Sequence, residues 1–223
     1  MLIRGFRRFV WLLGVTASAA GLAAPAAAQA PAAVEGDPTR GAEFYKSICL
    51  ECHGEVAAGI REMSSPSLHQ QEDWYLLGQL EKFRAGTRGT AEGDSTGAEM
   101  RAKALLLPDD QAMSDVVAYI KTLKGPGPAP ATLTGNAEAG AALYGTTCIA
   151  CHGADGKGMA VLKSPSLIGQ SDWYLQAQLA KFRAGQRGYD PTDVNGLQMK
   201  AMSATLANEQ AVLDVATYVR SLY

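Results

Sequence analysis

The chain has 223 residues, of which 47% are hydrophobic and 19% are charged, and its formal net charge is −2. This composition is ordinary for a folded protein and excludes a disordered or collagen-like chain. Beyond the first thirty residues the sequence holds no long apolar stretch and no basic run. These absences exclude a multi-span membrane protein and argue against nucleic acid as a partner.

Residues 1–28 have the pattern of a secretory signal peptide. Three arginines in the first eight residues precede an apolar stretch over residues 9–24, and small residues up to Ala28 resemble a cleavage site. An uncleaved membrane anchor is the alternative, since the apolar stretch is nearly long enough to span a bilayer. Both interpretations place the rest of the chain outside the cytoplasm, so we expect a periplasmic protein. Cleavage removes three arginines and no acidic residue, which leaves the mature chain acidic.

The remainder of the chain is a tandem repeat of one domain. Shifting the sequence by 99 positions aligns residues 39–124 with residues 138–223 without a gap, and about 37 of 86 positions are identical. Residues 125–134 between the copies are rich in proline and glycine, which is typical of an extended and fairly stiff linker. We therefore predict two domains, 36–124 and 135–223, joined by this linker.

Each copy predicts helices and no strand, so the expected fold class is all-α. Gly41 and Tyr45 lie four residues apart, which places them on one face of a first helix. A middle helix is expected to begin at the N-cap candidate Asp73 and to end at Gly86. A last helix, with a periodic apolar face, is expected over residues 109–123. The second copy repeats these features at Gly140, Tyr144, Asp172 and residues 208–222.

All four cysteines fall in two Cys-x-x-Cys-His motifs, which is the attachment signature of c-type haem. The two motifs consist of Cys49, Cys52 and His53, and of Cys148, Cys151 and His152. Two thiols about one helical turn apart can add to the two vinyl groups on one edge of a porphyrin. The histidine after the second thiol is then placed as the proximal iron ligand. The sequence therefore predicts two covalently attached haem c groups.

Other interpretations of the motifs explain less. A disulfide framework would not require a histidine after each pair of cysteines. Two zinc sites would need four ligands each, which four cysteines and three histidines cannot supply. A redox-active Cys-x-x-Cys pair normally accompanies a βαβ pattern, and none is present.

The sixth iron ligand is predicted to be methionine. The third histidine, His69, aligns with Ile168, so it cannot serve both domains, and we expect it to be a surface side chain. Among the methionines only Met100 and Met199 align with each other, and we expect them in the loop before the last helix. Histidine–methionine ligation gives potentials suited to electron transfer. Shared core packing is the alternative, and Met202 lies three residues from Met199.

Taken together, these patterns resemble the class I cytochromes c, and their tandem arrangement resembles the two-haem cytochrome c4 type. The resemblance covers nearly all of the mature chain and rests on both haem motifs, the paired methionines, two Ser-Pro-Ser-Leu segments and two Lys-Phe-Arg-Ala-Gly segments. It implies that the first and last helices of each domain cross. It also implies that Pro66 and Pro165 accept hydrogen bonds from the two haem histidines. One departure is the segment 54–59, which differs from the glycine-rich loop at 153–158.

Four arginines recur at equivalent positions on and after the middle helix and are candidate partners for the haem propionates. A solvated basic face is the equally weighted alternative. These residues are Arg84, Arg88, Arg183 and Arg187.

The function that the resemblance implies is periplasmic electron transfer without catalysis. Such a carrier takes single electrons from a quinol-oxidising complex or a dehydrogenase and passes them to a terminal oxidase or reductase. Its partners are redox proteins, and membrane association would arise through them or through an uncleaved signal. A cytochrome subunit of a dehydrogenase or oxidase complex is the first alternative. The second is a two-haem enzyme, such as a peroxidase or a thiosulfate dehydrogenase, which needs an open or unusually ligated iron.

Overall fold

A computed structural model describes residues 35–223, so the predicted signal peptide lies outside the described residues. Within this range the regular elements are helices, in agreement with the all-α prediction, and none is long and apolar enough to cross a membrane. The first half contains α1 (Pro38–Phe44), the π-helical η1 (Tyr45–Cys49), α2 (Leu50–His53), η2 (Arg61–Met63), α3 (Asp73–Ala85), α4 (Ser95–Ala104) and α5 (Asp110–Thr122). The second half contains α6 (Ala137–Thr147), α7 (Ile149–His152), η3 (Ala160–Leu162), α8 (Asp172–Arg183), α9 (Val194–Ala204) and α10 (Glu209–Ser221).

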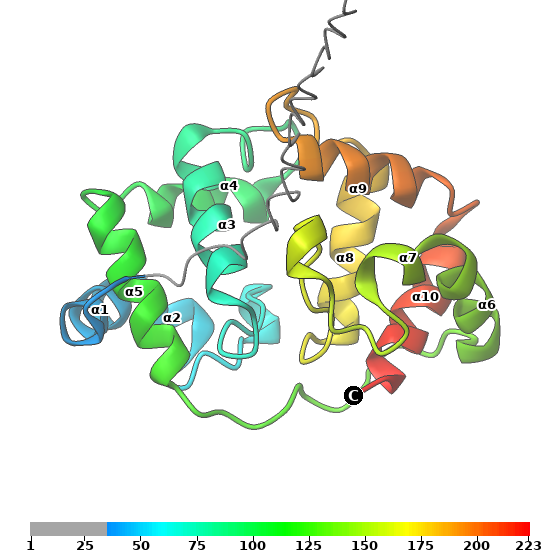
Figure 1. Ribbon diagram of the computed structural model, residues 1–223, viewed down its shortest axis with the longest axis horizontal. Coiled ribbons are helices and arrows are strands. Elements are labelled where there is room, and N and C mark those ends of the chain that lie inside the picture. The colour runs from blue at the N-terminus through cyan, green and yellow to red at the C-terminus, as the bar shows by residue number, and fades with distance from the viewer. Residues whose placement is uncertain (1–34) are drawn as a thin grey trace, which may run out of the picture.

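The two halves form two lobes, with the helices α3 and α8 towards the middle of the molecule (Figure 1). The first and last helices cross in each lobe, as the resemblance implied. A Cβ atom on Gly41 of α1 would overlap the carbonyl oxygen of Asp115 on α5, so only glycine allows this approach. The rings of Tyr45 and Tyr119 lie 5.4 Å apart at the same crossing. Gly140, Tyr144, Asp214 and Tyr218 repeat the arrangement in the second lobe.

The last helices were predicted to within one residue. Asp109 and Asn208 are their N-caps, and each side chain accepts a hydrogen bond from a backbone amide three residues later. The apolar face of α5 is almost completely buried and packs on Tyr45 and Leu76 in the core of the first lobe. The apolar periodicity predicted from the sequence therefore identifies the face of the last helix that packs in the core.

The predicted N-cap of the middle helix is wrong by one residue. Helices α3 and α8 begin at Asp73 and Asp172, so the N-caps are Glu72 and Ser171. The carboxylate of Asp172 has another task, since it accepts hydrogen bonds from the backbone amides of Thr132 (2.5 Å) and Leu133 (2.7 Å) in the linker. Asp172 therefore fastens the linker to the second lobe.

We expect Asp172→Asn to lower the free energy of unfolding by about 1–3 kcal/mol, because two linker amides lose the charged acceptor that the buried Asp172 provides. Burial opposes the ionisation of Asp172, but the amides of Leu133 and Thr132 hold its pKa below the ordinary value. Its contribution is therefore present above about pH 4 and is lost as the pH falls through the lowered pKa. Urea denaturation at pH 7 and at pH 3 measures both effects.

The equivalent substitution Asp73→Asn is the control, because the only backbone amide bound by Asp73 within the described residues is that of its neighbour Trp74. Asp73→Asn should lower the free energy of unfolding by less than about 0.5 kcal/mol. Equal losses in the two variants, or a loss at Asp172 that persists undiminished at pH 3, would contradict the role assigned to this carboxylate.

Candidate functional site

The two Cys-x-x-Cys-His motifs occupy equivalent places in the two lobes. Cys49 ends η1 and is followed by α2, while Cys148 joins α6 to α7. None of the four cysteines takes part in a disulfide. Burial raises the pKa of the Cys49 thiol to about 12 and that of Cys148 to about 11. A redox-active cysteine requires the opposite shift, so these thiols do not have the properties of a redox pair.

The two motif histidines are buried and have the same hydrogen bond. The Nδ1–H group of His53 donates to the carbonyl oxygen of Pro66, and that of His152 donates to the carbonyl oxygen of Pro165, both at 3.0 Å. Both bonds agree with the expectation from the resemblance. Burial lowers the pKa of each ring and favours neutral imidazole. With Nδ1 engaged, Nε2 keeps the lone pair that an iron ligand needs.

A cavity in the second lobe brings the predicted haem residues together. It is lined by apolar side chains and by Cys148, His152 and Met199. The remaining lining residues are Tyr144, Leu167, Leu175, Leu179, Val215, Ala216 and Val219. Their counterparts in the first lobe belong to its hydrophobic core or pack against it. The second-lobe set fits a large apolar group with one attachment edge and two axial ligands.

The predicted methionines lie in helices, whereas the sequence analysis expected a loop. Met100 is on α4 and Met199 is on α9, and both side chains are partly buried. Asp94 and Asp193 cap these helices, since their carboxylates accept hydrogen bonds from the amides of Gly97 and Gly196. The sequence gives no periodic apolar face in either segment, which is why the helices were missed.

Two ion pairs between the lobes were not anticipated. Lys82 on α3 lies 2.6 Å from Asp193, and Lys181 on α8 lies 2.5 Å from Asp94. Both aspartate side chains are at most 5% exposed. Each lobe therefore holds the N-cap of the helix that carries the methionine of the other lobe.

Arg88 and Arg187 meet at the same interface, each only 8% exposed. Arg88 bonds to Gln79 and Gln178, at 2.7 and 3.2 Å. Arg187 bonds to the same two glutamines and to the Tyr75 hydroxyl. Burial opposes ionisation of Tyr75, but the guanidinium of Arg187 lowers its pKa. Within residues 35–223 neither arginine has a carboxylate at ion-pair distance, so two buried cations lack counter-anions.

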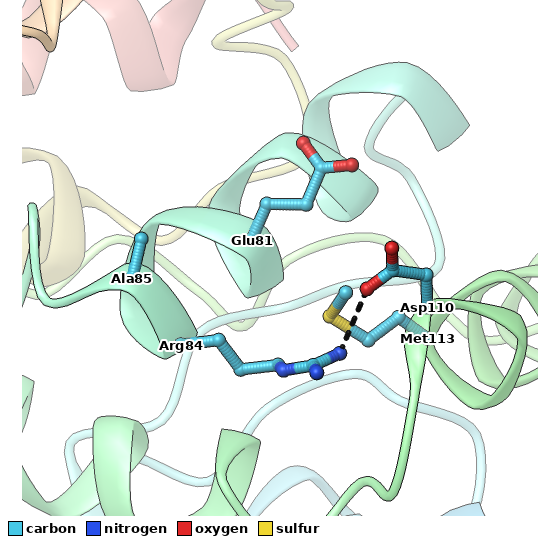
Figure 2. A pocket seen from close by; sticks show the side chains of 5 residues that line it. All are labelled: Glu81, Arg84, Ala85, Asp110 and Met113. Atoms are coloured by element: carbon cyan, nitrogen blue, oxygen red, sulfur yellow. Dashed lines mark hydrogen bonds and ion pairs between the residues drawn. The ribbon is translucent and has the colours of Figure 1, made fainter.

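Arg84 takes part in a different contact on the outer surface of the first lobe. Its guanidinium bonds to Asp110 at 3.0 Å across an open hollow between α3 and α5 (Figure 2). Of the two first-lobe arginine candidates, Arg88 therefore lies at the interface, and Arg84 lies partly exposed away from it.

His69 is half-buried, although a surface position was expected. Its Nδ1 atom lies 3.1 Å from the carbonyl oxygen of Ala57, and Gly125 of the linker covers its ring. Ala57 has a positive φ of 54°, at the position where the second copy has Gly156. The divergent loop after His53 is thus packed against a histidine that the second lobe lacks.

Comparison with known proteins agrees with this geometry. A family model described as cytochrome c matches residues 38–124 and again residues 137–223. The chain belongs to the cytochrome c family. With a haem motif in each of its two domains, it is a di-haem electron-transfer cytochrome with two covalently bound haem c groups.

Individual relatives agree with the cytochrome c4 type. The chain is 34% identical over 172 residues to a thiosulfate dehydrogenase electron acceptor of Stutzerimonas stutzeri (strain A1501), covering 73% of this chain and 76% of that protein. It is 29% identical over 187 residues to cytochrome c4 of Azotobacter vinelandii, covering 79% and 85%. The crystal structure of reduced cytochrome c4 from Pseudomonas stutzeri superposes with a TM-score of 0.65 at 27% identity, covering 85% of this chain and all of that one.

Proposed function

We propose that the protein is a periplasmic electron carrier with histidine–methionine iron in both domains. The iron ligands are His53 and Met100 in domain 36–124, and the equivalent pair in domain 135–223 is His152 and Met199. Cys49, Cys52, Cys148 and Cys151 form the thioether attachments. The observation that supports this assignment best is the apolar cavity shared by Cys148, His152 and Met199.

Bound haem would supply a one-electron iron(II)/iron(III) couple. The chain orients the ligands of the iron and surrounds it with apolar side chains. The bonds from the two histidines to Pro66 and Pro165 orient the imidazoles. The lining of the second cavity is mostly apolar, which would keep water from the iron. Tyr144 lines it too, but its hydroxyl donates to the carbonyl oxygen of Gly153 and is not free for acid or base chemistry. A carrier with both axial positions filled is therefore favoured over an enzyme.

The buried arginines at the interface suit the haem propionates. Arg88 and Arg187 have only neutral hydrogen-bond acceptors and repel each other, a costly arrangement that two carboxylates would relieve. A guanidinium can hold a carboxylate through two parallel hydrogen bonds. We assign these two residues, rather than Arg84, as propionate partners.

The partners are redox proteins that donate and accept single electrons, such as a quinol-oxidising complex or a dehydrogenase on one side and a terminal oxidase or reductase on the other. The relative named as an electron acceptor of thiosulfate dehydrogenase supports a dehydrogenase as donor. A permanent subunit of such a complex is the second candidate.

A redox titration of the purified, intact protein tests the carrier function. We expect two reversible one-electron steps per chain, with the spectrum low-spin throughout. The first domain should have the lower potential, because residues 35–124 contain fifteen acidic and ten basic residues, whereas residues 135–223 contain seven of each. A haem that binds exogenous ligands rapidly, or turns over peroxide or thiosulfate, would favour an enzyme instead.

A further inference from the structure

The second domain exposes a cluster of large apolar side chains that the first domain lacks. The side chains of Val161 and Val194 are 71% and 69% exposed, so they do not contribute to the core of the domain. The other exposed members are Ile149, Leu162, Leu197 and Met202. We call these six residues the apolar patch.

The internal repeat gives a direct comparison for each position. Val161, Val194, Leu197 and Met202 correspond to Glu62, Ser95, Ala98 and Lys103, while Ile149 and Leu162 correspond to the apolar Leu50 and Met63. Within residues 35–124 the exposed large apolar residues are Met63, Leu105 and Leu106. Met63 directly follows Arg61 and Glu62, and the two leucines lie outside the positions that correspond to the patch. The two domains share a fold and a haem motif but differ on this face.

The two ends of the patch lie on segments that also carry residues of the second haem site. Asn195, next to Val194, donates a hydrogen bond to the carbonyl oxygen of Lys163, next to Leu162, which brings the start of α9 against η3. In the first domain Lys103 pairs with Glu51 at 3.8 Å. The equivalent positions in the second domain are Met202 and Ala150, and Ala150 follows Ile149. Between Val194 and Met202, α9 carries Met199, which lines the cavity.

The segments that carry the patch have a net positive charge. Residues 148–168 and 194–207 contain three lysines and one acidic residue, Asp155, which pairs with Lys157 at 2.9 Å. The equivalent segments of the first domain, 49–69 and 95–108, contain four acidic and three basic residues. An apolar surface with a basic rim complements an apolar surface with an acidic rim.

We propose that the apolar patch is the docking surface for a redox protein whose contact face is apolar and ringed by carboxylates, so that electrons enter or leave through the second haem. This inference rests on the proposed carrier function and adds which domain meets that partner. Large contiguous exposed apolar patches mark interaction sites, and the basic rim sets orientation and the rate of encounter.

Voltammetry of the intact holoprotein on gold tests the proposal, with a mixed monolayer of methyl- and carboxylate-terminated thiols as the probe. The variant Val194→Glu/Leu197→Glu alters α9, and the matched control Ser95→Glu/Ala98→Glu adds the same charge at the equivalent positions of α4. We expect electron exchange at least tenfold slower for the α9 variant and within twofold of wild type for the α4 variant. Equal losses in both variants would overturn the proposal.

A second variant separates apolar contact from charge. Val194→Ser/Leu197→Ala installs the first-domain residues without changing charge, and it should slow exchange several-fold on the same surface. On a monolayer of methyl- and ammonium-terminated thiols, the basic rim should be repelled, so the Val194→Ser/Leu197→Ala variant should exchange as wild type does. A solution redox titration is run in parallel. If both haems titrate reversibly while exchange is unaffected by any α9 substitution, the docking surface is wrong and the carrier function stands; if they do not titrate, the carrier function fails.

Discussion

Met199→Ala is expected to remove the sulfur ligand from one iron only, halving the intensity of the sulfur-to-iron band of the oxidised protein. The side chain lines the cavity that also contains His152 and Cys148, and no other methionine lines it. Methionine raises the haem potential, so its loss should lower one of the two potentials by on the order of 0.1 V, within the range of roughly 0.8 V that axial ligands set. Absorption spectroscopy and redox titration measure both effects.

Met202→Ala is the matched control. Met202 lies three residues from Met199 on the same helix, is 37% exposed, and corresponds to Lys103 in the first domain. Its removal should leave both haems low-spin with full band intensity. If Met202→Ala alone abolishes half of the band, the ligand assignment is wrong.

Lys82→Met is expected to weaken the methionine site of the other domain. The Lys82 ammonium group lies 2.6 Å from Asp193, whose carboxylate also accepts a hydrogen bond from Gly196 and so caps α9. Removing the cation leaves a buried carboxylate without its partner. We expect a loss of about 3 kcal/mol in the free energy of unfolding, at the low end for a buried pair because Lys82 is partly exposed.

The distinguishing result is a crossed pattern. Lys82→Met, in the first domain, should reduce the sulfur band of the second haem and make its methionine easier to displace by imidazole. Lys181→Met, in the second domain, should do the same to the first haem through Asp94 and α4. A substitution that merely loosened its own domain would affect the haem of that domain instead.

Arg84→Met is the control for a charge lost from α3 itself. Its partner Asp110 has a side chain that is 94% exposed, so this surface pair should contribute less than about 1 kcal/mol and should not influence either methionine. If Arg84→Met and Lys82→Met have equal effects, the ion pairs between the lobes do not position the methionine helices.

The sequence was sufficient where local chemistry determines structure. The caps Asp109 and Asn208 and the apolar periodicity behind them define the last helices to within one residue. Gly41 and Tyr45 mark the helix crossing because that close approach excludes any Cβ atom. The repeat also singles out the haem motifs, and it predicts the methionine pair, because it filters out the residues that do not recur.

What the sequence did not show depends on contacts between distant segments. Asp172 resembles an N-cap by position, but its carboxylate accepts hydrogen bonds from linker amides 39 and 40 residues away. Arg88 and Arg84 are indistinguishable in sequence, and the association of the lobes buries Arg88 while Arg84 stays partly exposed. The capped helices of Met100 and Met199 lack an apolar period, and a lysine of the opposite lobe pairs with the N-cap aspartate of each helix.

The absorption spectrum of the intact oxidised protein, combined with haem and protein quantification, tests the central claim most directly. Histidine–methionine iron in both domains predicts two haems per chain, a fully low-spin ferric spectrum, and a sulfur-to-iron band with twice the intensity per chain of a one-haem cytochrome with the same ligands. A high-spin component, or a band with the intensity of a single haem, would contradict the proposed ligation and with it the carrier function.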